Sequence, residues 1–361
     1  MPGGGPWQAA PGYPPAGYAP PGYPMRPAPR PVWTVPAPPG SPYHRLARTP
    51  LHRWWRLLVG SLLILVSAIA LMIPAGVAVA VIHFATGGGE PVLSETEILG
   101  DPTADLALQL VLLAVFIPPV LFAAWVVQRR RPGTLSSVLG RLRWRWLLLC
   151  CGLAVVACLL SVGLAYLVEE LFPTAPPAEP EHWVGWSEFL LPAVLILLLV
   201  PFQATAEEYV FRGWLLQGIA ACTLETRTGR IGRAASAVFR TPWPAIAVSG
   251  VLFTAGHGYT GWGLLDIFGF AVLAGWLAVR TGGLEASIAI HVFNNLMAFW
   301  LIAAFGQLDS ALQQGDVPLQ TVIADLIPLA VYGALVVFAA RWRRVATVSP
   351  PAGDRAPVPA S

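Results

Sequence analysis

Long apolar runs recur along this chain and limit what it can fold into. Hydrophobic residues make up 56% of the 361 residues and charged residues 11%, against about 25% charged in a typical soluble domain. A helix needs about 20 consecutive apolar residues to cross a hydrocarbon core about 30 Å thick, and within lipid the backbone must satisfy its own hydrogen bonds. We therefore expect an all-α fold, a polytopic transmembrane helix bundle of about eight helices with disordered tails.

Eight apolar stretches are long enough, or nearly so, to cross the membrane as helices, and the sixth is the shortest. Prolines at positions 74, 118, 119 and 201 predict bends or breaks within them. The expected limits are Leu57 to Ile82, Leu106 to Val127, Leu147 to Val168, Phe189 to Ala206, Trp243 to Leu264, Ile267 to Val279, Ala286 to Phe305, and Thr321 to Ala340.

The two ends of the chain differ in composition from the rest. Residues 1–56 are rich in Pro, Gly, Ala and Tyr, and residues 345–361 again carry Pro and Ala. Such segments cannot bury enough apolar surface to offset the entropy of the chain. We expect a disordered cytoplasmic tail over 1–56, a transmembrane helical domain over 57–344, and a second disordered tail over 345–361.

The charged residues between the apolar stretches predict the orientation in the membrane. All 22 basic residues are arginines, and arginine-rich connections alternate with acidic ones. Arginine-rich loops favour the cytoplasmic side, so we expect a multi-pass protein of a bacterial plasma membrane with both termini in the cytoplasm. We interpret the arginines that accompany Trp144 and Trp146 as the same topological signal rather than as a surface-lying segment. A net charge of +3 is too small to indicate nucleic acid as a partner.

Polar side chains that are costly to place in lipid stand inside the second half of this pattern. Glu208 and Arg212 are four residues apart, so one helix face brings them together as an ion pair. Glu207 points about 100° away from Glu208 around the helix. Its carboxylate is therefore free of that arginine, and we expect it to act as a general base.

Two further positions supply groups for the same chemistry. His257 stands between two glycines, which permit close approach of another backbone or a substrate. His291 and Asn295 are four residues apart on one helix face, and both carry N–H donors suited to a developing oxyanion. The expected limits place His257 deeper than His291. These groups converge in a polar cavity in the cytoplasmic half of the bilayer if the fifth stretch starts later or bends, or if the fourth continues past Arg212.

The spacing of these residues resembles a known family. EExxxR at 207–212, FxxxH at 253–257 and HxxxN at 291–295 look like the three motifs of the CAAX prenyl protease and bacteriocin-processing family. Its members are intramembrane glutamic endopeptidases of the type II CAAX protease kind, also called the Abi family. The resemblance covers about residues 189–305, which we expect to form a protease-like core.

The resemblance implies metal-independent peptide hydrolysis without a cofactor. Glu207 would activate a water molecule, and His257 would help to position or deprotonate it. His291 and Asn295 would stabilise the oxyanion. The implied supporting residues are Glu208, Arg212 and Phe253.

Two other interpretations stay open at this point. Glu207, His257 and His291 could instead hold zinc and leave a fourth position for water, which would make the protein a zinc-dependent membrane protease with metalloendopeptidase activity. The second interpretation is a non-enzymatic membrane protein with the same fold, in an immunity or scaffold role. The expected partners are a peptide or membrane-protein substrate and the lipid bilayer. The sequence names neither the substrate nor its prenylation state.

Overall fold

The computed structural model describes residues 33–90, 92, 98–173, 182–224, 229–310 and 314–351. Regular structure in these ranges is helical, apart from isolated bridges between Pro42 and Val348 and between Ser137 and Gly283. The predicted all-α class is therefore confirmed. The helices described below belong to the compact unit that the chain forms after residue 33.

Seven helical stretches are long and apolar enough to cross a membrane, which supports a multi-pass membrane protein. The predicted orientation and the type of membrane stay predictions. The stretches are α1 (Trp55–Ala85), α2 (Pro102–Ala114) with α3 (Ile117–Val126), α4 (Trp144–Leu171), α5 (Trp186–Glu208) continued by the π-helical segment η3 (Tyr209–Leu215) and α6 (Leu216–Ala220), α9 (Gly263–Thr281), α10 (Glu285–Ala304) and α11 (Leu319–Trp342).

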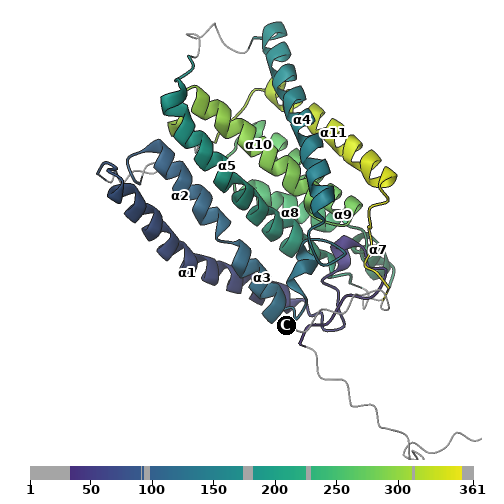
Figure 1. The fold of residues 1–361 in the computed structure, drawn as a ribbon. Helices are drawn as coiled ribbons and strands as arrows, with labels where there is room; N and C mark the ends of the chain where they lie inside the picture. Colours follow the sequence, from purple (N-terminus) through teal and green to yellow (C-terminus); the bar gives the residue numbers. More distant parts are fainter. Residues whose placement is uncertain are drawn as a thin grey trace, which may run out of the picture. The chain divides into compact units, whose positions relative to one another are not determined.

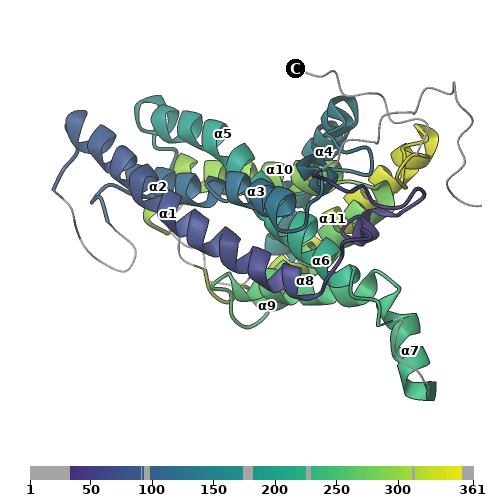
Figure 2. The same cartoon turned by 90° about the horizontal axis from the view of Figure 1, so that it is seen from below.

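The packing of these helices places the polar side chains of the second half together. Helix α5 lies between α2 and α10, α4 packs against both α10 and α11, and α1 runs beside α2 and α3 (Figure 1). The shorter helices are α7 (Gly229–Phe239) and α8 (Trp243–Ala255). Helix α8 packs against α9, whereas α7 extends away from the bundle (Figure 2).

The predicted limits of the fifth apolar stretch are wrong. Helix α8 ends at Ala255, although we expected this span to continue to Leu264. Its 13 residues give a length of about 20 Å, which is short of a hydrocarbon core about 30 Å thick. The physical reason is a glycine-rich segment, in which Gly256 caps the helix and Gly261 has a φ of +51°. Helix α9 in turn begins at Gly263, earlier than expected.

The prolines have unequal effects on the helices. The second stretch breaks between α2 and α3 immediately before Pro118 and Pro119, as predicted. In contrast, α1 and α5 continue through Pro74 and Pro201. The fourth stretch also continues beyond its predicted end at Ala206, as η3 and α6, which is one of the two conditions for the polar groups to converge.

Parts of both predicted tails are packed against the helices. Within the first tail, Tyr43 is fully buried, and its hydroxyl donates a hydrogen bond to the Leu135 carbonyl. Within the second, the Ser349 amide donates to the Ser41 carbonyl. The prediction of disorder is thus wrong for residues 34–54 and 345–351, because buried apolar side chains and pairing between the two segments hold them. Residues 1–32 and 352–361 lie outside the described residues.

Candidate active site

The transition from α5 to η3 presents two consecutive glutamates in different directions. Glu208 ends α5, and its Oε1 atom accepts hydrogen bonds from Arg212 Nη1 at 2.9 Å and from His291 Nδ1 at 2.8 Å. The Glu208 and Arg212 side chains are both buried, with 0% and 1% exposure. The ion pair predicted from the four-residue spacing is therefore present, and it also contacts α10.

Glu207 lies on the neighbouring face and keeps part of its carboxylate available. Its Oε1 atom accepts a hydrogen bond of 2.7 Å from Gln203 Nε2. Its Oε2 atom lies 3.5 Å from His291 Nε2 and has no hydrogen-bond partner among the described residues. The predicted separation of roles between the two glutamates thus has a geometric basis, because the arginine contacts Glu208 and not Glu207.

His291 connects the two carboxylates. The Nδ1 atom faces Glu208 and the Nε2 atom faces Glu207. An ionised carboxylate only accepts hydrogen bonds, so Nδ1 carries a proton and donates it to Glu208. With its tautomer and ring orientation fixed from that side, the imidazole directs Nε2 at the Glu207 carboxylate. Nε2 therefore lies 3.5 Å from Glu207 Oε2 without a hydrogen bond between the two atoms.

Gln203 completes this hydrogen-bond chain and was missed by the sequence reasoning. Its Oε1 atom accepts a bond of 3.1 Å from Asn295 Nδ2, while its Nε2 atom donates to Glu207. The side chain is buried, with 4% exposure. The signal was available, since Gln203 is a polar residue four positions before Glu207 in an apolar stretch.

His257 reaches the same region from a loop and not from a helix. It lies two residues beyond the end of α8, whereas the expected span from Trp243 to Leu264 placed it within a helix. The His257 ring nevertheless turns back toward the helix, and its Nδ1–H donates to the Phe253 carbonyl at 2.7 Å. A carbonyl only accepts, so Nε2 keeps its lone pair.

Phe253 packs between the charged and the imidazole groups. The guanidinium carbon of Arg212 lies 4.1 Å from the centre of its ring, a cation–π contact. The His257 ring centre lies 4.5 Å away and the His291 ring centre 5.9 Å away. The supporting role of Phe253 stays a prediction.

A cavity of about 340 Å³ unites the four predicted catalytic side chains, Glu207, His257, His291 and Asn295. Two further carboxylates line it, Asp266 from α9 and Asp325 from α11, and no arginine is among the described residues at its wall. A second cavity of about 180 Å³ shares Glu207 and His257 and is otherwise lined mainly by apolar side chains. The predicted polar cavity is therefore present, and its depth in the bilayer stays a prediction.

The residues considered for zinc do not form a metal site in the described ranges. No group of three or more His, Cys, Asp and Glu side chains there has an arrangement that could hold a metal ion. Glu207 and His291 are in contact, and the bond of His257 Nδ1 to the Phe253 carbonyl leaves His257 Nε2 without a partner among the described residues. The zinc interpretation of these three residues is therefore left to a chelation experiment.

Comparison with known proteins places this cavity in a family context. Residues 189–297 match the family model described as "Type II CAAX prenyl endopeptidase Rce1-like". The chain carries an Rce1-like segment. It runs from α5 into α10 and contains every residue of the three motifs, so the resemblance predicted from their spacing is confirmed.

One relative matches a longer part of the chain. It is the Bacillus subtilis (strain 168) protein named "Uncharacterized protein YyaK", which is 25% identical over 206 residues. The match covers 55% of this chain and 62% of the relative, which is less than two thirds of the relative's length. No solved structure matches the chain.

Proposed function

We propose that the Rce1-like segment is an intramembrane endopeptidase that hydrolyses a peptide bond with a water molecule activated by Glu207. The observation that supports it most strongly is the single 340 Å³ cavity lined by Glu207, His257, His291 and Asn295. A general base needs a carboxylate free to accept a proton within reach of the substrate. Glu207 Oε2 meets this requirement because it has no hydrogen-bond partner among the described residues.

The proposed mechanism assigns a step to each side chain. Water attacks the peptide carbonyl carbon and gives a proton to Glu207, while His257 Nε2 accepts a hydrogen bond from the same water. Asn295 and His291 donate to the oxyanion, with the His291 cation stabilised by Glu208. Collapse of the tetrahedral intermediate breaks the C–N bond, and the proton held by Glu207 passes to the leaving amine.

The charges of the site are compatible with this assignment. The proposed mechanism uses His291 with a proton on both ring nitrogens, and the Glu207 and Glu208 carboxylates that face these nitrogens would stabilise that cation. Arg212 pairs with Glu208 and offsets one of the two negative charges. No metal ion or cofactor takes part in the proposed chemistry.

The proposed substrates are peptides or membrane proteins that reach the cavity from the bilayer. The apolar cavity of 180 Å³ beside Glu207 and His257 offers space for an apolar substrate group next to the cleaved bond. In this proposal the protein works in a bacterial plasma membrane with both termini in the cytoplasm.

The test compares the purified full chain with its Glu207→Gln variant on a peptide library read by mass spectrometry. Because the substitution keeps the shape and removes the base, we expect cleavage to fall by about 10²–10⁴-fold. Glu188→Gln is the matched control, because Glu188 is an exposed residue at the start of the same helix α5. Unchanged cleavage by Glu207→Gln would overturn the proposal.

Two further measurements separate the proposal from the alternatives. Cleavage that survives a zinc chelator supports the metal-independent mechanism, whereas cleavage lost on chelation and restored by zinc supports the zinc protease. Full biological activity of Glu207→Gln in cells, despite loss of cleavage in vitro, would support an immunity or scaffold role. Peptides that accumulate in the Glu207→Gln strain would identify the substrate.

A further inference from the structure

A third cavity, of about 870 Å³, lies where α4 begins and α11 ends. Arg141 and Arg145 line it from the segment around the start of α4, and Arg343 lines it from the residue after α11. None of the described residues at its wall is acidic. The cavity is therefore strongly positive, in contrast to the one that contains Glu207.

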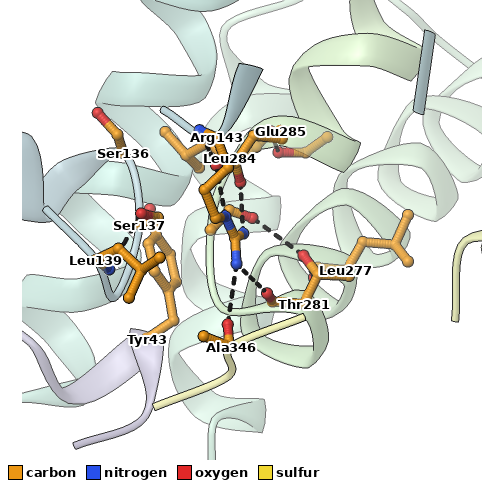
Figure 3. Close-up of polar contacts among 12 residues, drawn as sticks. Tyr43, Ser136, Ser137, Leu139, Arg143, Leu277, Thr281, Leu284, Glu285 and Ala346 are labelled. Atoms are coloured by element: carbon orange, nitrogen blue, oxygen red, sulfur yellow. Dashed lines mark hydrogen bonds and ion pairs between the residues drawn. The ribbon is translucent and has the colours of Figure 1, made fainter. Parts of the chain in front are cut away.

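The ion pair at this wall involves Arg143, which also lines the cavity, and leaves the charges of the other three arginines in place. Arg143 Nη2 lies 2.6 Å from Glu285 Oε2, and Arg143 Nε donates to Glu285 Oε1 at 2.8 Å (Figure 3). Arg143 Nη1 also donates to the Thr281 and Ala346 carbonyls. Glu285 is fully buried in this pair, so its negative charge is already compensated by Arg143.

Trp146 provides a second and independent indication of a ligand. It lines the cavity and is 94% buried, having 6% exposure. Its indole Nε1–H has no hydrogen-bond partner among the described residues. An indole nitrogen only donates, and a buried donor is normally paired. An oxygen atom of a bound anion would supply the missing acceptor.

The surroundings favour a lipid as the source of that anion. Trp144 at the start of α4 and Trp342 at the end of α11 are 66% and 70% exposed. Exposed tryptophans and arginines at the ends of membrane-spanning helices are typical of the membrane–water interface. The start of α4 also carries the positive end of its helix dipole, with no side-chain cap.

We propose that this cavity binds the phosphate group of an anionic phospholipid, with Arg145, Arg343 and the Trp146 indole as its contacts. The distribution of arginines along the sequence was explained by membrane topology alone. The cavity and the unpaired buried donor add a specific site, because topology requires neither of them.

The experiment measures thermal unfolding of the purified full chain in neutral detergent. Three probes are added separately: dioctanoyl phosphatidylglycerol, dioctanoyl phosphatidylcholine and inorganic phosphate. We expect the phosphatidylglycerol to raise the melting temperature at concentrations at least about tenfold below those that phosphatidylcholine requires. Equal effects of the two lipids would overturn the proposal. Stabilisation by inorganic phosphate as strong as that by phosphatidylglycerol would overturn the lipid as the source of the phosphate.

Variants locate the effect on the proposed contacts. The double variant Arg145→Gln with Arg343→Gln should lose the preference for phosphatidylglycerol, and Trp146→Phe should weaken it by severalfold while keeping an aromatic side chain. Arg341→Gln is the matched control, because Arg341 is an exposed arginine at the end of the same helix and does not line the cavity. If the control loses the preference as fully as the double variant, the binding is general surface electrostatics and the proposal fails.

Discussion

Two buried glutamate–arginine pairs stabilise different parts of this protein and differ in how completely they are hydrogen-bonded. Glu208 and Glu285 are both fully buried, and each lies within 3 Å of an arginine nitrogen, at 2.9 Å and 2.6 Å respectively. Glu285 accepts bonds from the backbone amide, Nε and Nη2 of Arg143. In contrast, Glu208 Oε2 and Arg212 Nη2 have no partner within the described part of the chain.

The Arg143–Glu285 pair connects several parts of the fold, whereas the Arg212–Glu208 pair positions groups of the candidate active site. Arg143 connects the segment before α4 with the end of α9, the start of α10 and the chain after α11. The Glu208 pair makes fewer bonds to the backbone but fixes His291, whose other nitrogen faces Glu207. The Glu208–Arg212 pair is therefore the less completely hydrogen-bonded of the two, and it is the one that holds His291 beside Glu207.

Between the two pairs, the larger catalytic effect is predicted for breaking the Glu208–Arg212 pair. Replacing Glu208 with glutamine leaves Arg212 without its counter-ion and removes the carboxylate that holds the Nδ1 proton of His291. We expect the cleavage rate per folded molecule to fall by about 10²–10³-fold, because the imidazole loses its fixed tautomer and its charge stabilisation. The measurement is turnover of a cleaved library peptide, normalised to folded protein, with Glu188→Gln as control. A rate equal to the control would remove Glu208 from the mechanism.

The second prediction breaks the other pair in the same way. Glu285→Gln leaves Arg143 as an uncompensated, mostly buried charge, which costs about 3–5 kcal/mol of stability. Its cleavage rate per folded molecule should change by less than about twofold, because Glu285 does not line the cavity that contains Glu207. Unfolding in a denaturing detergent measures the first quantity and peptide turnover measures the second. A catalytic loss as large as that of Glu208→Gln would erase the distinction between the two pairs.

The sequence predicted one of these pairs and not the other. Glu208 and Arg212 are four residues apart, so helix geometry alone brings them together. Arg143 and Glu285 are 142 residues apart, and their contact depends on how α4 and α10 pack, which no local pattern specifies. The three motifs predicted four of the side chains that line the cavity but not Gln203, Asp266 or Asp325, and the catalytic roles of the four stay predictions.

Local chemistry also explains where the prediction of the fold was wrong. An apolar pattern extends through residues 243–264, but Gly256 ends α8 and leaves His257 in a loop. The Pro-rich segment before α1 was expected to be disordered on its composition, whereas single large side chains such as Tyr43 find buried positions against other elements. Composition averages over a segment and cannot report such individual contacts.

A smaller effect tests whether the hydrogen bonds from Asn295 to Gln203 and from Gln203 to Glu207 orient the Glu207 carboxylate. Gln203→Leu removes the donor to Glu207 and the acceptor for Asn295 while keeping a side chain of similar size. Loss of such an orienting bond is worth about 1–2 kcal/mol, so we expect turnover to fall by about tenfold with little change in KM. Gln109→Leu is the control, because Gln109 lines the same cavity from α2 and has no role in the proposed mechanism. A change in KM alone would assign Gln203 to substrate binding instead.

The smallest predicted effect is a pH dependence of the stability of the segment around His44, which packs near the Arg143–Glu285 pair. Tyr43 donates to the Leu135 carbonyl, and the next carbonyl, that of Ser136, accepts from the Leu284 amide, so residues 43–45 pack close to that pair. Burial, and secondarily the charge of Arg45, lowers the pKa of His44 from 6.5 to about 4. The unfolded segment therefore binds a proton more readily between those values, and stability decreases as the pH falls through this window.

We expect a loss of about 1 kcal/mol between pH 7.5 and pH 5.5 from His44. Limited proteolysis of the segment around residues 34–54 at the two pH values measures it, because opening of the segment exposes its backbone. His44→Phe should abolish the pH dependence of cleavage in that segment, whereas His182→Phe, at an exposed position before α5, should leave it intact. If the two variants respond alike, the pH dependence of the segment arises from groups other than His44.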